Sequence, residues 1–342
     1  MDDRRHTGKK LKLTAVPCGR CKALALVVSL AAAGLLTLAL FAAGCGETPD
    51  TSAPERTVID RSAGWQDALL YIADENGPTP DWGSIRIYDD VSGFVENTVE
   101  QSAAASPVDV CVTPDGGSMY VAGGPNGRID KFRWDGNNWN RAGVTVDTPA
   151  QQITSIAPGP DGKLYVVADE GGSSRIYAVN LATDSIEGPP LSFPDLPDLR
   201  GIAWSPDGST VYLAGVSAQK TARLDAAGWP SLNIKGRADL PGAAAIHPLP
   251  SVDGRLVYVT ALGAVFKIDA ASMGLAGSLA PSGNPATVYS GSALSADGKS
   301  MFVAGKSAGE DSTLYVLDLA SGSVVKSIKH ISDTAGGIQR VE

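Results

Sequence analysis

The sequence predicts an all-β protein, and three observations support this class. An Asp-Gly turn signal recurs along the chain at intervals of 46, 46, 46 and 44 residues. The aspartates of these signals are Asp115, Asp161, Asp207, Asp253 and Asp297. An aromatic residue follows each of them by four or five positions, and no helical hydrophobic period of useful length occurs after residue 45.

Each repeat is predicted to form four short strands. A small apolar strand such as 201–204 leads into the Asp-Gly hairpin, and an apolar second strand such as 211–214 follows it. The third strand alternates, as in 313–318, and a more polar fourth strand such as 323–328 completes the unit. The third strands are expected to end in turns made by Asp or Asn, at Asp89, Asn180, Asp225, Asp269 and Asp318.

Repeats of 40–50 residues with four strands each predict a β-propeller. The first unit begins near Trp65 with a degenerate signal at 66–68, and it has no first strand upstream. Residues 335–342 resemble a first strand, and joining them to the first unit completes six blades in a strand-swap closure that removes open sheet edges. The alternative of seven blades would need a seventh turn signal.

The repeat units resemble those of the YVTN-type β-propeller family. The resemblance is carried by segments 251–260 (SVDGRLVYVT), 295–304 (SADGKSMFVA) and 314–325 (LYVLDLASGSVV), and the repeat pattern covers residues 65–342. It implies a propeller fold. It also implies a wide range of functions, because such repeats occur in lactonases, surface proteins and binding scaffolds.

The first 44 residues are predicted to be an export signal. A segment with seven basic and two acidic residues precedes an uncharged apolar run over 23–44, which is also long enough for an uncleaved anchor helix. The run ends in small residues before Cys45 and resembles the lipobox of bacterial lipoproteins, with Ala42 where that motif usually has Leu. The resemblance implies lipidation of Cys45. We expect a tether over 45–64 and a propeller over 65–342, outside the cytoplasm, on the periplasmic side of a membrane or at the cell surface.

Charge and composition exclude several functions. The net charge of −9 becomes about −14 once residues 1–44 are removed, which argues against nucleic-acid binding. Only His247 and His330 then remain for histidine chemistry, and they could work together only if the fold brought them close. Cys111 lies in an apolar strand and is expected to be a buried, inert thiol.

Loops at the mouth of the predicted central channel supply the candidate site residues. Three loops between second and third strands are acidic. One loop leading into a first strand, 193–200, carries two carboxylates and a guanidinium. The candidates are Asp74, Glu75, Asp169, Glu170, Asp198, Arg200, Glu310, Asp311 and His330. The carboxylates could hold Ca²⁺ or meet a basic partner, and the structural alternative is solvated loop charge with Arg200 paired to Asp198.

These features favour a membrane-tethered, monomeric scaffold that binds a protein or a small molecule. The sequence contains no convergent catalytic set, so no catalytic residue is assigned and no cofactor other than Ca²⁺ is considered. The family resemblance implies the alternative, a lactonase-like hydrolase or lyase with its site at the channel mouth.

Overall fold

The computed structural model describes part of the N-terminal region and most of the repeat region. The described residues are 14–16, 25–27, 69–74, 84–89, 95–100, 106–123, 127–242, 244–332 and 334–341. The chain divides into two units, Met1–Val58 and Ile59–Glu342. In the first unit, β1 (Thr14–Val16) pairs antiparallel with β2 (Ala25–Val27).

The membrane-related predictions fall largely outside these residues. Cys45 and the tether over 46–64 lie outside the described residues. Among the residues that are described, no helix is long and apolar enough to cross a membrane.

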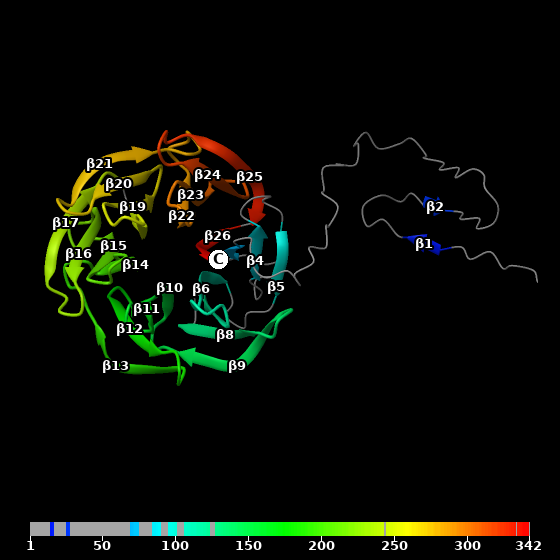
Figure 1. Cartoon of the computed structure of the whole chain (residues 1–342), viewed down its shortest axis with the longest axis horizontal. Helices are drawn as coiled ribbons and strands as arrows, with labels where there is room; N and C mark the ends of the chain where they lie inside the picture. Colours follow the sequence, from blue (N-terminus) through cyan, green and yellow to red (C-terminus); the bar gives the residue numbers. More distant parts are fainter. Residues whose placement is uncertain are drawn as a thin grey trace, which may run out of the picture. The chain divides into compact units, whose positions relative to one another are not determined.

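The second unit is all-β and consists of six four-stranded antiparallel blades (Figure 1). Blade 1 contains β26 (Ala335–Val341), β3 (Leu69–Asp74), β4 (Ser84–Asp89) and β5 (Val95–Glu100). Blade 2 contains β6 (Pro107–Val112), β7 (Ser118–Gly123), β8 (Arg128–Trp134) and β9 (Trp139–Asp147). Blade 3 contains β10 (Gln152–Pro158), β11 (Lys163–Asp169), β12 (Ser174–Asn180) and β13 (Ser185–Leu191).

The remaining three blades continue the ring. Blade 4 contains β14 (Asp198–Trp204), β15 (Thr210–Val216), β16 (Ala222–Gly228) and β17 (Ile234–Leu240). Blade 5 contains β18 (Ala245–Pro250), β19 (Leu256–Ala261), β20 (Val265–Asp269) and β21 (Gly274–Leu279). Blade 6 contains β22 (Val288–Leu294), β23 (Ser300–Lys306), β24 (Ser312–Asp318) and β25 (Val324–Ser332).

The first strand of each blade lies at the centre of the ring, and the fourth lies at the rim (Figure 1). Each inner strand contacts the inner strands of both neighbouring blades, so the ring is closed. In blade 1 the inner strand is β26, which pairs antiparallel with β3 from the other end of the propeller sequence. The prediction of six blades is confirmed, and the seven-bladed alternative is wrong, because the described part of the propeller forms six such sheets.

The recurring Asp-Gly signals form the hairpins between first and second strands. In blade 4 the Gly208 amide donates to the Ser205 carbonyl, and the Ser209 amide donates to the Asp207 carboxylate at 3.0 Å. Gly208 has φ of +69°, a left-handed conformation that glycine adopts without steric strain. These bonds hold the Asp207 carboxylate in its charged form, and its pKa is lowered to about 2.

The turns after the third strands follow the prediction at most positions. Side chains of Asn180, Asp269 and Asp318 accept hydrogen bonds from amides two or three residues ahead. The prediction of a turn at Asp225 is wrong, because Asp225 lies inside β16 and is buried there. Its carboxylate lies 2.9 Å from Arg223, and Arg223 is buried with it, so the residue forms an ion pair within the blade instead of a turn.

The repeated aromatic residues hold the blades together. Six apolar clusters are formed, one between each pair of neighbouring blades. Each cluster contains one repeat aromatic that is at most 4% exposed. These residues are Tyr71, Tyr120, Tyr165, Tyr212, Tyr258 and Phe302. Burial of these rings, together with the aliphatic side chains around them, stabilises the contacts between blades. Cys111 lies in one of these clusters, and burial raises the pKa of its thiol.

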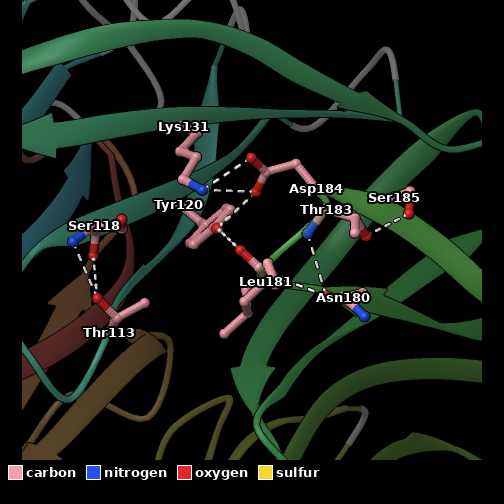
Figure 2. Close-up of polar contacts among 10 residues, drawn as sticks. Thr113, Ser118, Tyr120, Lys131, Asn180, Leu181, Thr183, Asp184 and Ser185 are labelled. Carbon is pink, nitrogen blue, oxygen red and sulfur yellow. Dashed lines mark hydrogen bonds and ion pairs between the residues drawn. The ribbon is translucent and has the colours of Figure 1, made fainter.

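A buried ion pair also joins blades 2 and 3 (Figure 2). Lys131 on β8 lies 2.8 and 2.9 Å from the two carboxylate oxygens of Asp184, which belongs to the turn between β12 and β13. The Tyr120 hydroxyl donates to the same carboxylate at 2.8 Å, and both charged side chains are less than 10% exposed. Because each charge is neutralised by the other, the pair can remain in this low-dielectric interface.

Candidate functional site

The inner strands carry one structural irregularity in common. Each has a β-bulge near its beginning, where its pairing with the second strand shifts. The bulged residues are Val108, Thr154, Arg200, Ile246, Ser290 and, in β26, Gly336 with Gly337. Bulges re-aim side chains and interrupt regular pairing. All of these residues line one cavity at the centre of the ring.

We call this space the channel-mouth cavity. Its volume is about 560 Å³, and its walls come from the inner strands of all six blades together with the nearby loops. Its polar side chains belong to Asp109, Gln152, Thr154, Ser155, Asp169, Ser174, Asp198, Arg200, Lys220, His247 and Ser290. The cavity therefore offers a ligand hydrogen-bond donors, hydrogen-bond acceptors and charged side chains of both signs.

Asp109 is a buried carboxylate in the wall of this cavity. It accepts hydrogen bonds from the Val110 amide at 2.9 Å, the Ile156 amide at 2.9 Å and the Ser155 hydroxyl at 3.0 Å. These bonds favour the charged form, but burial outweighs them and raises the pKa of Asp109 to about 6. The residue bridges blades 2 and 3, because two of its three donors belong to β10.

A glycine in blade 1 makes room for this carboxylate. A Cβ on Gly337 would lie 1.8 Å from Oδ1 of Asp109, which no side chain can tolerate. The position of the Asp109 carboxylate therefore depends on residues from three blades.

His247 occupies the position equivalent to Asp109 in blade 5. It lies within β18, and its backbone amide donates to the Thr260 hydroxyl, which in turn donates to the His247 carbonyl. Within the described part of the chain its imidazole has no hydrogen-bond partner. Burial lowers the pKa of His247 to about 4, so the ring is neutral at pH 7 and offers one N–H donor and one nitrogen acceptor to the channel.

Three of the predicted site residues line the channel-mouth cavity. Arg200 donates to both carboxylate oxygens of Asp198, at 3.0 and 2.9 Å, which is the pairing considered from the sequence. Asp169 accepts the Gly172 amide at 2.8 Å. These side chains are partly exposed at the rim, where Lys220 adds a cation that has no partner among the described residues.

The other predicted residues lie outside the walls of this cavity. Asp74 is buried and pairs with Arg86 at 3.0 Å, while Glu170 contacts Tyr177 and Arg175 within blade 3. The Glu310 amide donates within a turn of blade 6.

His330 and Asp311 form an exposed pair at 2.8 Å. His330 lies on the fourth strand of blade 6, whereas His247 lies on the inner strand of blade 5 and lines the cavity, so the structure does not bring them together there. Glu75 lies outside the described residues.

The acidic loops do not assemble into a cation site in the described part of the chain. No three His, Cys, Asp or Glu side chains there lie close enough to hold a metal ion. Asp74, Asp169 and Asp311 belong to blades 1, 3 and 6, respectively. The Ca²⁺ expectation therefore has no supporting geometry among these residues.

Sequence reasoning did not select Asp109, Lys220 or Thr154. A signal for Asp109 exists in the repeat itself, because Asp109, Ser155, Gly201 and His247 follow one another at intervals of 46 residues. Polar residues at one repeat position of an otherwise apolar inner strand mark the side chains that the ring brings together.

Comparisons with known proteins support the fold. No protein-family model and no curated protein matches the chain. A functionally unknown protein from Desulfotomaculum acetoxidans aligns with a TM-score of 0.56 and 14% identity, over 81% of this chain and 99% of its own. A "putative 6-phosphogluconolactonase" from Bacteroides fragilis aligns with the same score and identity, over 83% and 100%. At this identity the likeness shows the propeller fold alone.

Proposed function

We propose that this chain is an extracytoplasmic propeller that is tethered to a bacterial membrane through Cys45. In this proposal it binds a small polar ligand in the channel-mouth cavity without transforming it. The observation that carries the ligand site is the cavity itself. Its volume of about 560 Å³ falls in the range of about 300–1,000 Å³ that is typical of small-molecule sites.

The chemistry of the walls favours a ligand with hydroxyl groups and an anionic group. Asp169, Gln152 and Thr154 supply acceptors and donors for hydroxyls. Arg200 and Lys220 supply positive charge at the rim, and Arg200 retains donors beyond the two bonds it makes to Asp198.

The arrangement of polar groups argues against nucleophilic catalysis. The Ser155 hydroxyl donates to Asp109, and that carboxylate is also occupied by two backbone amides. A nucleophile needs a base within hydrogen-bond reach, but the His247 imidazole has no such contact among the described residues.

The alternative is a lactonase-like hydrolase or lyase at the same site. Its specific support is the neutral imidazole of His247 in the cavity wall, together with the fold likeness to the Bacteroides fragilis protein. A base with a pKa of about 4 is weak at neutral pH, which makes this the less favoured function.

The binding proposal can be tested with gluconate, which carries hydroxyls and a carboxylate, by titration calorimetry on the full chain. We expect Arg200→Ala to weaken binding about tenfold, the loss expected for one charge-assisted contact. Arg175→Ala is the matched control, since Arg175 also pairs with a carboxylate but lies outside the cavity. Equal affinities in both variants would contradict the proposal.

A hydrolysis assay distinguishes the binding function from the enzymatic alternative. Glucono-1,5-lactone mixed with the protein should hydrolyse at its uncatalysed rate. A higher rate that falls in His247→Gln would instead establish the enzymatic alternative.

The tether has its own test. Cells that express the chain are supplied with an alkyne-labelled fatty acid, and the protein should carry the label in the wild type but not in Cys45→Ser. Label retained by Cys45→Ser would contradict lipidation at this residue.

A further inference from the structure

The exposed large apolar side chains of the propeller are concentrated on one side of the ring. The described part of the chain has seven of them, and all belong to blades 4, 5 and 6, which follow one another around the ring (Figure 1). They are Ile234, Val252, Leu262, Leu275, Val288, Val324 and Val325. Single exposed apolar residues are common on soluble proteins, so it is their shared location that requires an explanation.

Five of the seven lie at the end of the propeller opposite to the channel mouth, which we call the lower end. The Asp-Gly hairpins lie at this end, because the channel mouth is lined by the opposite ends of the inner strands. The turns between third and fourth strands lie there too, since each third strand ends beside the residue that follows the hairpin, as Asp318 does beside Ser300. The five side chains in the hairpins or at the start of the fourth strands, which are 40–62% exposed, are Ile234, Val252, Leu275, Val324 and Val325.

The lower end of these three blades is also nearly neutral, although the protein is acidic. Its hairpins and turns contain four basic and five acidic side chains, a net charge of −1, over residues 205–210, 228–235, 251–256, 269–275, 295–300 and 318–326. Ile234 directly precedes Lys235, and Val325 directly precedes Lys326. An aliphatic side chain beside a long cationic one suits a lipid interface, because the cation can remain among the headgroups while the apolar group leaves the water.

The propeller part of the chain begins at the same end. β3 is its first described strand, and Leu69 at the start of β3 pairs with Val341, at the end of β26 that lies away from the channel mouth. Blade 1, which contains both strands, packs against blade 6. Cys45 precedes Leu69 by 24 residues, a length that can span at most roughly 80 Å. A lipid on Cys45 therefore keeps the bilayer within reach of the lower end.

We propose that the lower end of blades 4–6 rests on the lipid bilayer that holds the chain, with the five apolar side chains inserted among the headgroups. This inference rests on the proposed tether at Cys45. Each apolar side chain is stabilised when it leaves water, and the tether gives the bilayer a high effective concentration, so several small contacts are sufficient. In this orientation the channel-mouth cavity faces away from the membrane and is open to ligands from solution.

A fluorescent reporter shows which end of the propeller meets the bilayer. The lipidated full-length product is reconstituted into vesicles of phosphatidylethanolamine and phosphatidylglycerol, with or without a nitroxide-labelled lipid that quenches nitrobenzoxadiazole (NBD). NBD is attached at Val325→Cys or at Val288→Cys, and Val288 is the matched control because it is 41% exposed but lies at the channel-mouth end. The introduced thiol is the reactive one, since Cys111 is 2% exposed and Cys45 carries the lipid. We expect the nitroxide to lower the emission at position 325 at least about twofold and to leave the emission at position 288 nearly unchanged.

A pair of double variants tests whether the apolar side chains make the contact. With NBD at Leu275→Cys, replacing Val324 and Val325 by serine should lower the quenching at least about twofold, because the lower end loses two apolar contacts. Leu262→Ser with Val288→Ser is the matched control, and it should leave the quenching at position 275 unchanged. All of these side chains are exposed, so the melting temperatures should stay close to that of the unsubstituted reporter, which shows that the variants are folded.

Three results would overturn the inference. They are equal quenching at positions 325 and 288, no quenching at position 325, and unchanged quenching in the folded variant with serine at 324 and 325. Failure of the proposed tether gives a different result, because the wild type would then not float with the vesicles, and the inference would fail with it. Gluconate binding in the channel-mouth cavity involves none of these side chains, so its absence would leave the inference unaffected.

Discussion

Replacing Gly337 by alanine tests how the channel is held together. The added Cβ would lie 1.8 Å from Oδ1 of Asp109, 2.6 Å from its Cγ and 3.2 Å from its Cα. Real Cβ contacts are essentially never closer than 3.0 Å, so the two groups must separate by about 1.2 Å. Gly336 beside it already lies against the Val108 carbonyl, which leaves the backbone of β26 little room to move.

The expected cost follows from two effects. Overpacking of a close contact costs about 1–3 kcal/mol. Moving the Asp109 carboxylate also weakens three hydrogen bonds of 2.9–3.0 Å, each worth about 1.5–3 kcal/mol for a charged acceptor when fully lost. With partial loss of these bonds, we expect Gly337→Ala to lower the free energy of unfolding by about 3–5 kcal/mol.

Urea unfolding monitored by tryptophan fluorescence measures this cost. In an Asp109→Ala background the carboxylate is gone, and the same Gly337→Ala change should then cost less than about 1 kcal/mol. Gly274→Ala is the control, because its Cβ would meet only the flexible Ser272 hydroxyl at 3.2 Å. A cost for Gly337→Ala that is below about 1 kcal/mol, or equal in both backgrounds, would refute the reasoning.

Three further predictions concern the ion pair, the channel and the turns. Lys131→Met leaves a buried carboxylate without its cation, and the free energy of unfolding should fall by about 3 kcal/mol in urea unfolding; a loss under about 1 kcal/mol would contradict a buried pair. Burial raises the pKa of Asp109 from 3.8 to about 6, so the folded state binds this proton more tightly and the residue's contribution to stability rises by up to about 3 kcal/mol as the pH falls from 7 to 4. The pKa of His247 is lowered, so its effect on stability has the opposite pH dependence. Its contribution to the free energy of unfolding falls by a similar amount between pH 6.5 and 4. Between pH 7 and pH 4.5, the free energy of unfolding should therefore fall more in Asp109→Asn than in the wild type, and less in His247→Gln. An equal fall in all three proteins would refute both pKa shifts. Gly208→Ala, with φ of +69° and a Cβ that would lie 2.8 Å from Pro160, should cost about 2 kcal/mol, against about 1 kcal/mol for Gly116→Ala, which has open space; equal melting temperatures would contradict the steric part of this difference.

The candidate site was predictable in part. Asp198 and Arg200 were predicted to lie in a loop that leads into an inner strand; the structure places both within that strand, β14, and both line the cavity. Asp74 was selected on similar grounds, but its side chain pairs with Arg86 inside blade 1. A loop position predicts which end of the ring a residue occupies, whereas the direction of its side chain depends on partners from other strands.

The sequence by itself determined the class, the blade number and the residues between the blades. These properties repeat every 44–46 residues, and each depends on short-range signals such as an Asp-Gly turn or an alternating strand, which can be detected without knowing the rest of the chain. Only the tertiary structure decided which residues meet in the channel. Asp109 and Gly337 are far apart in the sequence, and Lys131 meets Asp184 across two blades, because closure of the ring sets these distances.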